Sequence, residues 1–275
     1  MICENIVLDP ARPEVVLTTY RLYDSPEYDT GKRRPAVLIC PGGAYLRTAD
    51  REAEFVALAF AAQGYHAFVL RYSCGARGAL PQPVLEAFRA IALIRAKADE
   101  WFVDPNKIAV LGFSAGGHLA SMTLTAWKDA DMLALLPGLT AVQIRPDAGI
   151  LCYPCIIFPS LIKGMDDTMM GRTDYTPAEA AAYSTDRKVD GDTPPCYVWT
   201  TATDAAVRPG DSFAFVRALM AAGVSAEFHL FAEGEHGMSL AVPQTAGRPA
   251  MIDARAAAWF PMAVSWLALQ MAKDR

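Results

Sequence analysis

Apolar residues in this chain occur in short continuous runs, separated by longer stretches in which they recur with helical spacing. The continuous runs predict strands covered on both faces, at 36–40, 66–71, 107–111, 147–153, 196–201 and 226–231. The amphipathic stretches predict helices, at 50–63, 82–101, 211–222 and 251–272. Strand and helix thus alternate along most of residues 1–275, which predicts one α/β domain with a mostly parallel sheet and helices on both faces. Two early runs predict N-terminal antiparallel strands, at 6–8 and 15–22.

The segment 156–192 interrupts this alternation. At about 37 residues it is far longer than an ordinary connection, and it contains Met165, Met169 and Met170. We expect a small cap or lid inserted beside the site. Because methionine is apolar and adaptable, these side chains either line a substrate pocket or anchor the segment to the body, and the sequence leaves both roles open.

Composition and charge narrow the function classes. The residues are 53% hydrophobic and 20% charged, with a formal net charge of −5, which suits a sizeable core that needs no metal or disulfide. Lysines and arginines are scattered, so no basic stripe indicates nucleic acid. No stretch reaches the roughly 18–20 apolar residues that span a bilayer, and the first five residues do not resemble a signal peptide. We therefore expect a cytoplasmic protein without nucleic-acid or membrane partners, and the oligomeric state stays open, a homodimer included.

The six cysteines lie mostly in or beside apolar runs, where a free thiol packs as a small hydrophobic group. Cys152 and Cys155 have the spacing of a redox motif or of half a zinc site. No second pair of cysteines or histidines completes four ligands. We interpret the two as a structural pair and expect no metal.

The stretch from Gly112 to Gly117 reads Gly-Phe-Ser-Ala-Gly-Gly, with Ser114 at its centre. An apolar run precedes it at 108–111, and a helix-like stretch follows at 118–124. A strand that turns sharply into a helix with serine at the bend is a nucleophile elbow. An ordinary turn is the alternative, but the strand before and the helix after are the context that the motif requires. We predict Ser114 as a nucleophile.

A serine hydroxyl becomes nucleophilic when a neutral histidine accepts its proton. The chain contains four histidines, of which His66 and His229 fall inside predicted strands. His118 lies on the helix that runs away from the elbow. His236 lies in a glycine-flanked loop directly after the strand 226–231, and we predict it as the general base and acid.

The carboxylate that orients such a histidine is expected after an intermediate strand. Asp204 lies just past the strand 196–201 and is the predicted acid. Asp211 is the alternative, although its place ahead of a helix gives it a helix-start role. Glu235 should point away from its neighbouring histidine, and Asp147 opens an earlier strand.

A tetrahedral oxyanion needs two or three convergent N–H donors. Ala115, directly after the serine, supplies one, and the loop after the strand 36–40 is the expected source of the second. Gly42 and Gly43 are the candidates there, because glycine lets the backbone approach a substrate oxygen. The next two residues of the loop are predicted to border the substrate pocket, namely Ala44 and Tyr45.

These residues resemble the α/β-hydrolase superfamily, and more narrowly the bacterial esterases related to acetyl-xylan esterases and hormone-sensitive-lipase-like carboxylesterases. The resemblance implies hydrolysis of short acyl esters, often acetyl groups on sugars, without a cofactor. Two departures stand out, since Pro41 and Ala44 replace the usual His and third Gly, and Arg208 interrupts the usual Val-Pro after the acid. The matching stretches are 38–43, 64–65, 69–72, 81–83, 103–108, 112–119, 204–207 and 235–237.

The sequence therefore predicts a serine carboxylesterase whose partner is a small-molecule ester. A serine peptidase of the acylaminoacyl-peptidase or prolyl-oligopeptidase type, without a propeller, is one alternative. A non-catalytic α/β-hydrolase that binds a ligand is the other.

Overall fold

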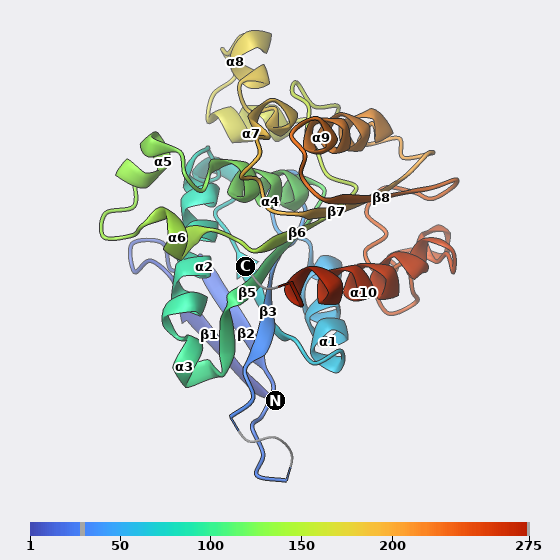
Figure 1. Ribbon diagram of the computed structural model, residues 1–275. Helices are drawn as coiled ribbons and strands as arrows, with labels where there is room; N and C mark the ends of the chain where they lie inside the picture. Colours follow the sequence, from blue (N-terminus) through green and yellow to red (C-terminus); the bar gives the residue numbers. More distant parts are fainter. Residues whose placement is uncertain (28–30, 274–275) are drawn as a thin grey trace.

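The computed structural model of the protein describes residues 1–27 and 31–273. Its described strands form one sheet in the order β1-β2-β4-β3-β5-β6-β7-β8 (Figure 1). The pairs β1–β2 and β2–β4 are antiparallel, and every later pair is parallel. The predicted mostly parallel sheet with N-terminal antiparallel strands is confirmed. The strands are β1 Ile2–Val7, β2 Val16–Arg21, β3 Arg34–Cys40, β4 His66–Arg71, β5 Val103–Phe113, β6 Ala148–Cys152, β7 Cys196–Thr201 and β8 Ala226–Phe231.

Helices cover both faces of this sheet. In Figure 1, α1 and α10 lie on one face, whereas α2, α4 and α9 lie on the other. The α-helices are α1 Glu54–Ala62, α2 Gln82–Ala96, α3 Ala98–Trp101, α4 Ala115–Ala126, α5 Ala130–Ala134, α6 Ala141–Ile144, α7 Met165–Met170, α8 Pro177–Ala181, α9 Pro209–Ala221 and α10 Trp259–Met271. Short 3₁₀ helices are η1 Asp50–Glu52, η2 Gly75–Arg77, η3 Thr185–Lys188, η4 Pro249–Met251 and η5 Ala256–Ala258.

The central strands contain long apolar runs because successive side chains enter two different cores. In β3, Leu38 and Cys40 pack with α2 and α4, whereas Val37 and Ile39 pack with α1 and α10. All four side chains are fully buried. A strand covered on both faces needs apolar residues on both, which explains the unbroken runs in the sequence.

Several elements differ from their predicted bounds. The helix predicted at 82–101 divides into α2 and α3 at Lys97, whose backbone (φ −92°, ψ 10°) is not helical. The strand predicted at 107–111 begins earlier, because Val103 pairs with Arg34 across an irregularity in the β3–β5 ladder. The helix predicted at 251–272 becomes α-helical only at Trp259.

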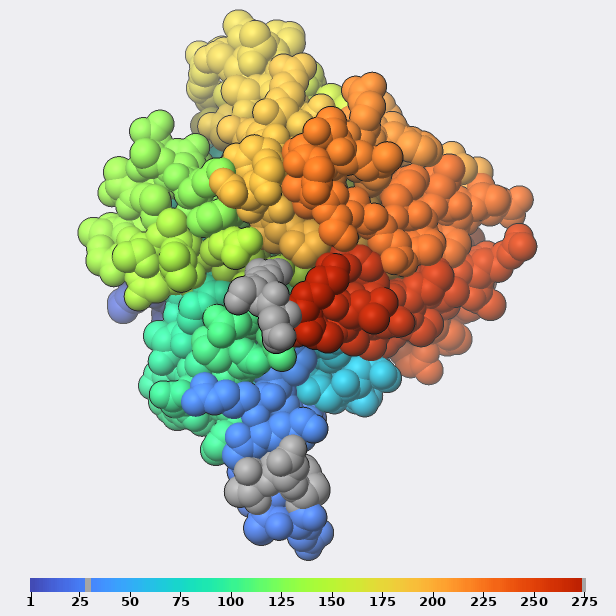
Figure 2. Space-filling view, in the orientation of Figure 1, coloured from blue at the N-terminus to red at the C-terminus, as the bar shows by residue number. Residues whose placement is uncertain are grey.

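The segment predicted as a cap contains α7, α8 and η3. Figure 2 shows this yellow part of the chain as a lobe at the top of the molecule, beside the orange α9. Met165 and Met169 are fully buried in the core that also contains the inner faces of α2 and α4, and Met170 packs against it. These contacts favour the anchoring role for the methionines.

Within residues 1–27 and 31–273, no helix is both long enough and apolar enough to cross a membrane.

Candidate active site

Ser114 occupies a strained turn between β5 and α4, with φ 53° and ψ −118°. Its N–H donates to the Cys152 carbonyl at 3.0 Å, which fixes the turn to the end of β6. A Cβ on Gly112 would lie 2.0 Å from the Gly116 carbonyl oxygen, and one on Gly116 would lie 2.1 Å from the Cys40 carbonyl oxygen. Only residues without a side chain allow the strand and the helix to approach so closely, so the glycines of the motif are needed for the elbow.

The three residues predicted as a triad lie within hydrogen-bonding distance of one another. Ser114 Oγ is 2.7 Å from His236 Nε2, and His236 Nδ1 is 2.7 Å from Asp204 Oδ2. They follow β5, β8 and β7, whose carboxyl ends meet at one edge of the sheet. The histidine side chain is 19% exposed and the aspartate side chain is 1% exposed. Solvent therefore reaches the imidazole but not the carboxylate.

The Asp204 carboxylate is oriented by its own loop. Its Oδ1 accepts the N–H groups of Ala206 and Val207, both at 2.9 Å, while Oδ2 lies against the histidine ring. Bonds from two backbone donors hold the plane of this carboxylate fixed. The predicted alternative, Asp211, lies elsewhere and makes no contact with His236.

A cavity of about 250 Å³ opens beside the serine and the histidine. Gly43, Ala44 and Ile162 are among the residues that line it. A larger hollow, of about 540 Å³, lies around Arg95 and Lys107, and none of Ser114, Asp204 and His236 lines it.

The backbone N–H groups of the loop after β3 fall into two groups, those bonded within the protein and those with no acceptor among the described residues. The Gly42 N–H donates to Glu52 Oε2 at 2.8 Å, which counts against its predicted role as an oxyanion donor. The N–H groups of Gly43 and Ala44 donate to no acceptor in the described part of the chain. Gly43 (φ 129°) and Ala44 (φ 58°) both have left-handed backbone, as the sharp turn of the loop requires. A Cβ on Gly43 would lie 2.1 Å from the Arg47 carbonyl oxygen.

Tyr45 does not border the cavity, and this prediction was wrong. The side chain is fully buried beneath the loop, where its hydroxyl lies 2.9 Å from His118 Nδ1 and its ring packs edge-on against Tyr72. Tyr45 has φ 57°, so the loop turns at this point and directs the ring into the core, whereas Ala44 does line the cavity.

Two buried residues beside the cavity were not predicted as part of the site. Glu52, in η1, is 1% exposed, and burial raises the pKa of its carboxyl group. Its second oxygen, Oε1, accepts the hydroxyl of Tyr153 at 2.8 Å. The Tyr153 ring packs edge-on against the His236 ring, with centroids 5.1 Å apart. No local sequence signal distinguishes Glu52, because it is one of four charged residues in the stretch 50–54.

A family profile described as BD-FAE matches residues 23–148. The solved structure of MGS-M1, an alpha/beta hydrolase enzyme from a Medee basin deep-sea metagenome library, is 33% identical, with 99% of each chain covered and a TM-score of 0.80. The acetyl ester-xyloside bifunctional hydrolase from Caldicellulosiruptor lactoaceticus is 32% identical, with 97% of this chain and 96% of that chain covered and a TM-score of 0.81.

This chain belongs to the α/β-hydrolase family. An acetylxylan esterase from Xylanibacter ruminicola is 27% identical over 218 residues, which cover 77% of this chain and 42% of that protein. The chain spans between a third and about half of the length of the curated relatives that it matches. Esterases and carboxylesterases recur among these relatives, which confirms the predicted class of carboxylic ester hydrolase.

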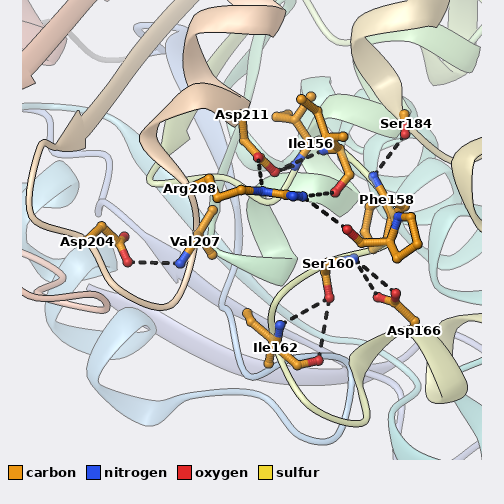
Figure 3. A network of polar contacts seen from close by, with 12 residues as sticks. Ile156, Phe158, Ser160, Ile162, Asp166, Ser184, Asp204, Val207, Arg208 and Asp211 are labelled. Carbon is orange, nitrogen blue, oxygen red and sulfur yellow. Dashed lines mark hydrogen bonds and ion pairs between the residues drawn. The ribbon is translucent and has the colours of Figure 1, made fainter.

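In this α/β-hydrolase, Asp211 and Arg208 bind the start of the segment 156–192 (Figure 3). Asp211 Oδ2 accepts the N–H groups of Ile156 and Ile157, both at 2.9 Å. Arg208 bonds to Asp211 through Nε, and its Nη2 donates to the Ile157 and Pro159 carbonyls at 3.3 and 3.0 Å. The arginine that departs from the family pattern therefore ties the loop after Asp204 to the segment that leads to the cavity.

The remaining histidines of the hydrolase lie away from the serine. His118 lies between Tyr45 and the Tyr183 carbonyl, which Nε2 contacts at 2.9 Å. His66 Nδ1 accepts the Leu22 N–H at 3.1 Å. Cys152 and Cys155 are free and buried, as a structural pair would be.

Proposed function

We propose that this domain is a serine carboxylesterase that hydrolyses short-chain esters, chiefly acetyl esters, through Ser114, His236 and Asp204. The observation that carries the proposal is the continuous line of contacts from Ser114 Oγ through the imidazole to a buried carboxylate, beside a small cavity. Serine, base and acid in this order are the parts that nucleophilic acyl transfer requires.

The reaction begins with the transfer of the Ser114 proton to His236 Nε2 as Oγ bonds to the ester carbonyl carbon. Asp204 accepts the Nδ1–H, holds the ring in the tautomer that leaves Nε2 free, and stabilises the imidazolium. The imidazolium then protonates the leaving alcohol as the C–O bond breaks. Water enters, loses its proton to the same nitrogen, and hydrolyses the acyl-enzyme, which restores the serine.

The oxyanion is proposed to bind to the N–H groups of Gly43, Ala44 and Ala115. The first two have no acceptor among the described residues and line the cavity or its wall. Ala115 is the first residue of α4, where backbone N–H groups lack partners within the helix. Gly42 is left out because Glu52 already occupies its N–H.

The proposed substrates are small acetyl esters, including acetylated sugars and xylo-oligosaccharides. The cavity of about 250 Å³ favours a short acyl chain, and Leu46 and Ile162 form apolar parts of its lining. Ile162 belongs to the segment 156–192, which we propose acts as a cap on a single domain of residues 1–275. The relative named as an acetylxylan esterase and the one named as an acetyl ester-xyloside hydrolase support this choice of substrate.

Replacing Ser114 with alanine tests the central claim. The S114A variant is expected to fold normally and to retain less than ~10⁻³ of the wild-type kcat on 4-nitrophenyl acetate, because the nucleophile is gone. Turnover is followed by nitrophenolate release, and folding by circular dichroism. Substantial turnover by a folded S114A protein would contradict the proposed serine mechanism.

A second experiment tests the substrate. kcat/KM is measured for acetyl, butanoyl, hexanoyl and octanoyl esters of one alcohol, then for acetylated xylo-oligosaccharides and a peptide anilide. We expect the acetyl ester to be fastest, turnover to fall with chain length, and the anilide to be inert. Preference for octanoyl esters, or faster cleavage of the anilide, would contradict the proposed substrate class.

A further inference from the structure

Glu52 is a buried acid at the active site that the mechanism above does not use. Its side chain lines the cavity beside Ser114 and His236, yet the residue is only 1% exposed. Both carboxylate oxygens accept a hydrogen bond, Oε2 from the Gly42 N–H and Oε1 from the Tyr153 hydroxyl, each at 2.8 Å. A carboxylate that only accepts is in the arrangement of its charged form.

On one side, this carboxylate fixes the loop that carries the proposed oxyanion donors. Besides the Gly42 N–H contact to Glu52, the Gly42 carbonyl accepts the Ala49 N–H at 2.8 Å. The Tyr72 hydroxyl donates to the Pro41 carbonyl at 2.6 Å. Gly42 is thus held at both its N–H and its carbonyl. The two residues that follow line the cavity, and their N–H groups have no acceptor among residues 1–27 and 31–273.

On the other side, η1 and Tyr153 fix the loop that carries His236. The Tyr153 hydroxyl, which donates to Glu52, accepts the Ser239 N–H at 2.8 Å. Arg51 Nε donates to the Gly237 carbonyl at 2.8 Å, and the Ser239 hydroxyl donates to the Arg51 carbonyl at 2.7 Å. Residues 51 and 52 therefore bond to both loops that must meet across the substrate.

We propose that Glu52 is a positioning residue, which fixes the oxyanion loop and the His236 loop relative to each other. Its carboxylate also places a negative charge near the imidazolium that forms during catalysis. The inference rests on the proposed function. The positioning role follows from the hydrogen bonds of Glu52 and Tyr153 to the two loops. The electrostatic role follows because a buried charge near a developing opposite charge is screened far less than an exposed one.

Several other groups act on the histidine and must be kept constant in a test. Asp204 and Ser114 contact its two ring nitrogens, and Tyr153 packs on the ring. The other titratable and charged groups around it are Arg47 and Arg51, which line the same cavity, and the adjacent Glu235, paired with Arg248. Replacing the carboxylate of Glu52 with an amide of the same shape leaves these side chains in the protein, but it removes the charge and one of the two acceptor oxygens.

The test compares E52Q with a matched control, E86Q. Glu86 is also fully buried and also accepts a backbone N–H and a hydroxyl, both from Ser73, but it does not line the cavity. The measurements are kcat and KM on 4-nitrophenyl acetate, the pH profile of kcat/KM, and the urea-unfolding free energy. Wild-type turnover on this neutral ester serves as the separate test of the proposed function.

For E52Q we expect kcat to fall by about tenfold or more, with a smaller change in KM. We also expect the acid limb of kcat/KM to move down by roughly half a pH unit or more, because the lost negative charge had favoured the protonated histidine. E86Q is expected to lose stability while keeping the wild-type acid limb and kcat. Wild-type kcat and acid limb in E52Q would overturn the inference, as would equal kinetic losses in the two variants.

Y153F supplies the test if E52Q does not fold. It keeps the charge but disconnects Glu52 from Ser239, so kcat is expected to fall while the acid limb stays in place. Unchanged kcat in Y153F would overturn the positioning role. If the wild-type protein itself hydrolyses no ester, the proposed function fails instead, and the two failures are distinguished.

Discussion

At the scale of single residues, Gly42 is enclosed on three sides. A Cβ there would lie 2.7 Å from the Phe113 carbonyl oxygen, 2.8 Å from Glu52 Oε2 and 2.9 Å from Ser114 Cβ. Two of these neighbours are parts of the elbow, which cannot give way without moving the serine. Gly42, which has no proposed bond to the substrate, thus sets how closely the loop after β3 approaches Ser114.

We expect G42A to reduce kcat by about 10²-fold, the cost of losing one oxyanion donor, because the added methyl group displaces the loop. The control is G210A, in α9, where a Cβ meets no atom within 4 Å and the backbone φ is ordinary. G210A should keep full activity and wild-type or slightly higher stability, since alanine favours a helix. Wild-type kcat in a folded G42A protein would show that the loop position does not limit catalysis.

At the scale of elements, the loop after β7 connects Asp204, the proposed acid, to the segment 156–192. Asp204 orients the histidine, and four residues later Arg208 binds the carbonyls of Ile157 and Pro159. Ile162, a few residues further along, lines the cavity. The position of this apolar wall thus depends on a side chain from the same loop as the acid (Figure 3).

We expect R208A to loosen this wall and to raise the ratio of hexanoyl to acetyl ester turnover by roughly threefold to tenfold. R172A is the matched control, because Arg172 forms its ion pairs with Asp174 and Glu179 inside the same segment but away from the cavity. The ratio of kcat/KM values for the two esters is the readout. An unchanged ratio in R208A, or an equal rise in both variants, would contradict a specific role for Arg208.

The order of the elements could be predicted from the sequence, but contacts between distant segments could not. Unbroken apolar runs predict buried strands because each strand serves two cores. By contrast, Val103 and the polar residues that follow it look like a loop, and they are a strand only because Arg34 pairs with Val103. Likewise the sequence predicts Tyr45 at the pocket, whereas in the structure the turn of its loop directs the ring onto His118.

The residues of the candidate site also fall into two groups, those that the sequence predicts and those that it does not. Ser114, Asp204 and His236 each follow a predicted strand, so topology alone places them at one sheet edge. Glu52 acts through bonds to residues 10 and 101 positions away, Gly42 and Tyr153, and no local pattern encodes such a bridge. Sequence reasoning thus reached the residues at strand ends and missed those that depend on side-chain packing between elements.

At the scale of the whole molecule, two buried histidines link stability to pH. Burial lowers the pKa of His118 to about 4, and burial likewise lowers the pKa of His66 to about 4. The hydrogen bonds agree with neutral rings. His118 Nε2 faces the Tyr183 carbonyl and so carries the proton, whereas His66 Nδ1 accepts the Leu22 N–H and cannot carry one without breaking that bond.

The sign of the effect follows from the lowered pKa values. Above the ordinary imidazole value of about 6.5, both folded and unfolded chains hold these rings neutral, and the stability is fully present. As the pH falls from about 6.5 toward 4, the unfolded chain takes up protons first, so each ring costs the folded state up to roughly 3 kcal/mol. Burial raises the pKa of the carboxyl groups of Glu52 and Asp211, which acts in the opposite direction and offsets part of the loss.

We therefore expect the free energy of unfolding to decrease steadily between pH 6.5 and 4.5, and to decrease less in H118Q. Glutamine can still donate to the Tyr183 carbonyl but takes up no proton. His66 is then the one remaining ring of the two whose protonation changes the unfolding free energy in this pH range. Urea unfolding of both proteins at several pH values in this window gives the two slopes. H118Q will be less stable at pH 7, because it loses ring packing against Phe158 and Tyr45, yet its slope should be the shallower. Parallel slopes would mean that His118 titrates alike in the folded and unfolded chains, against its burial between two tyrosines.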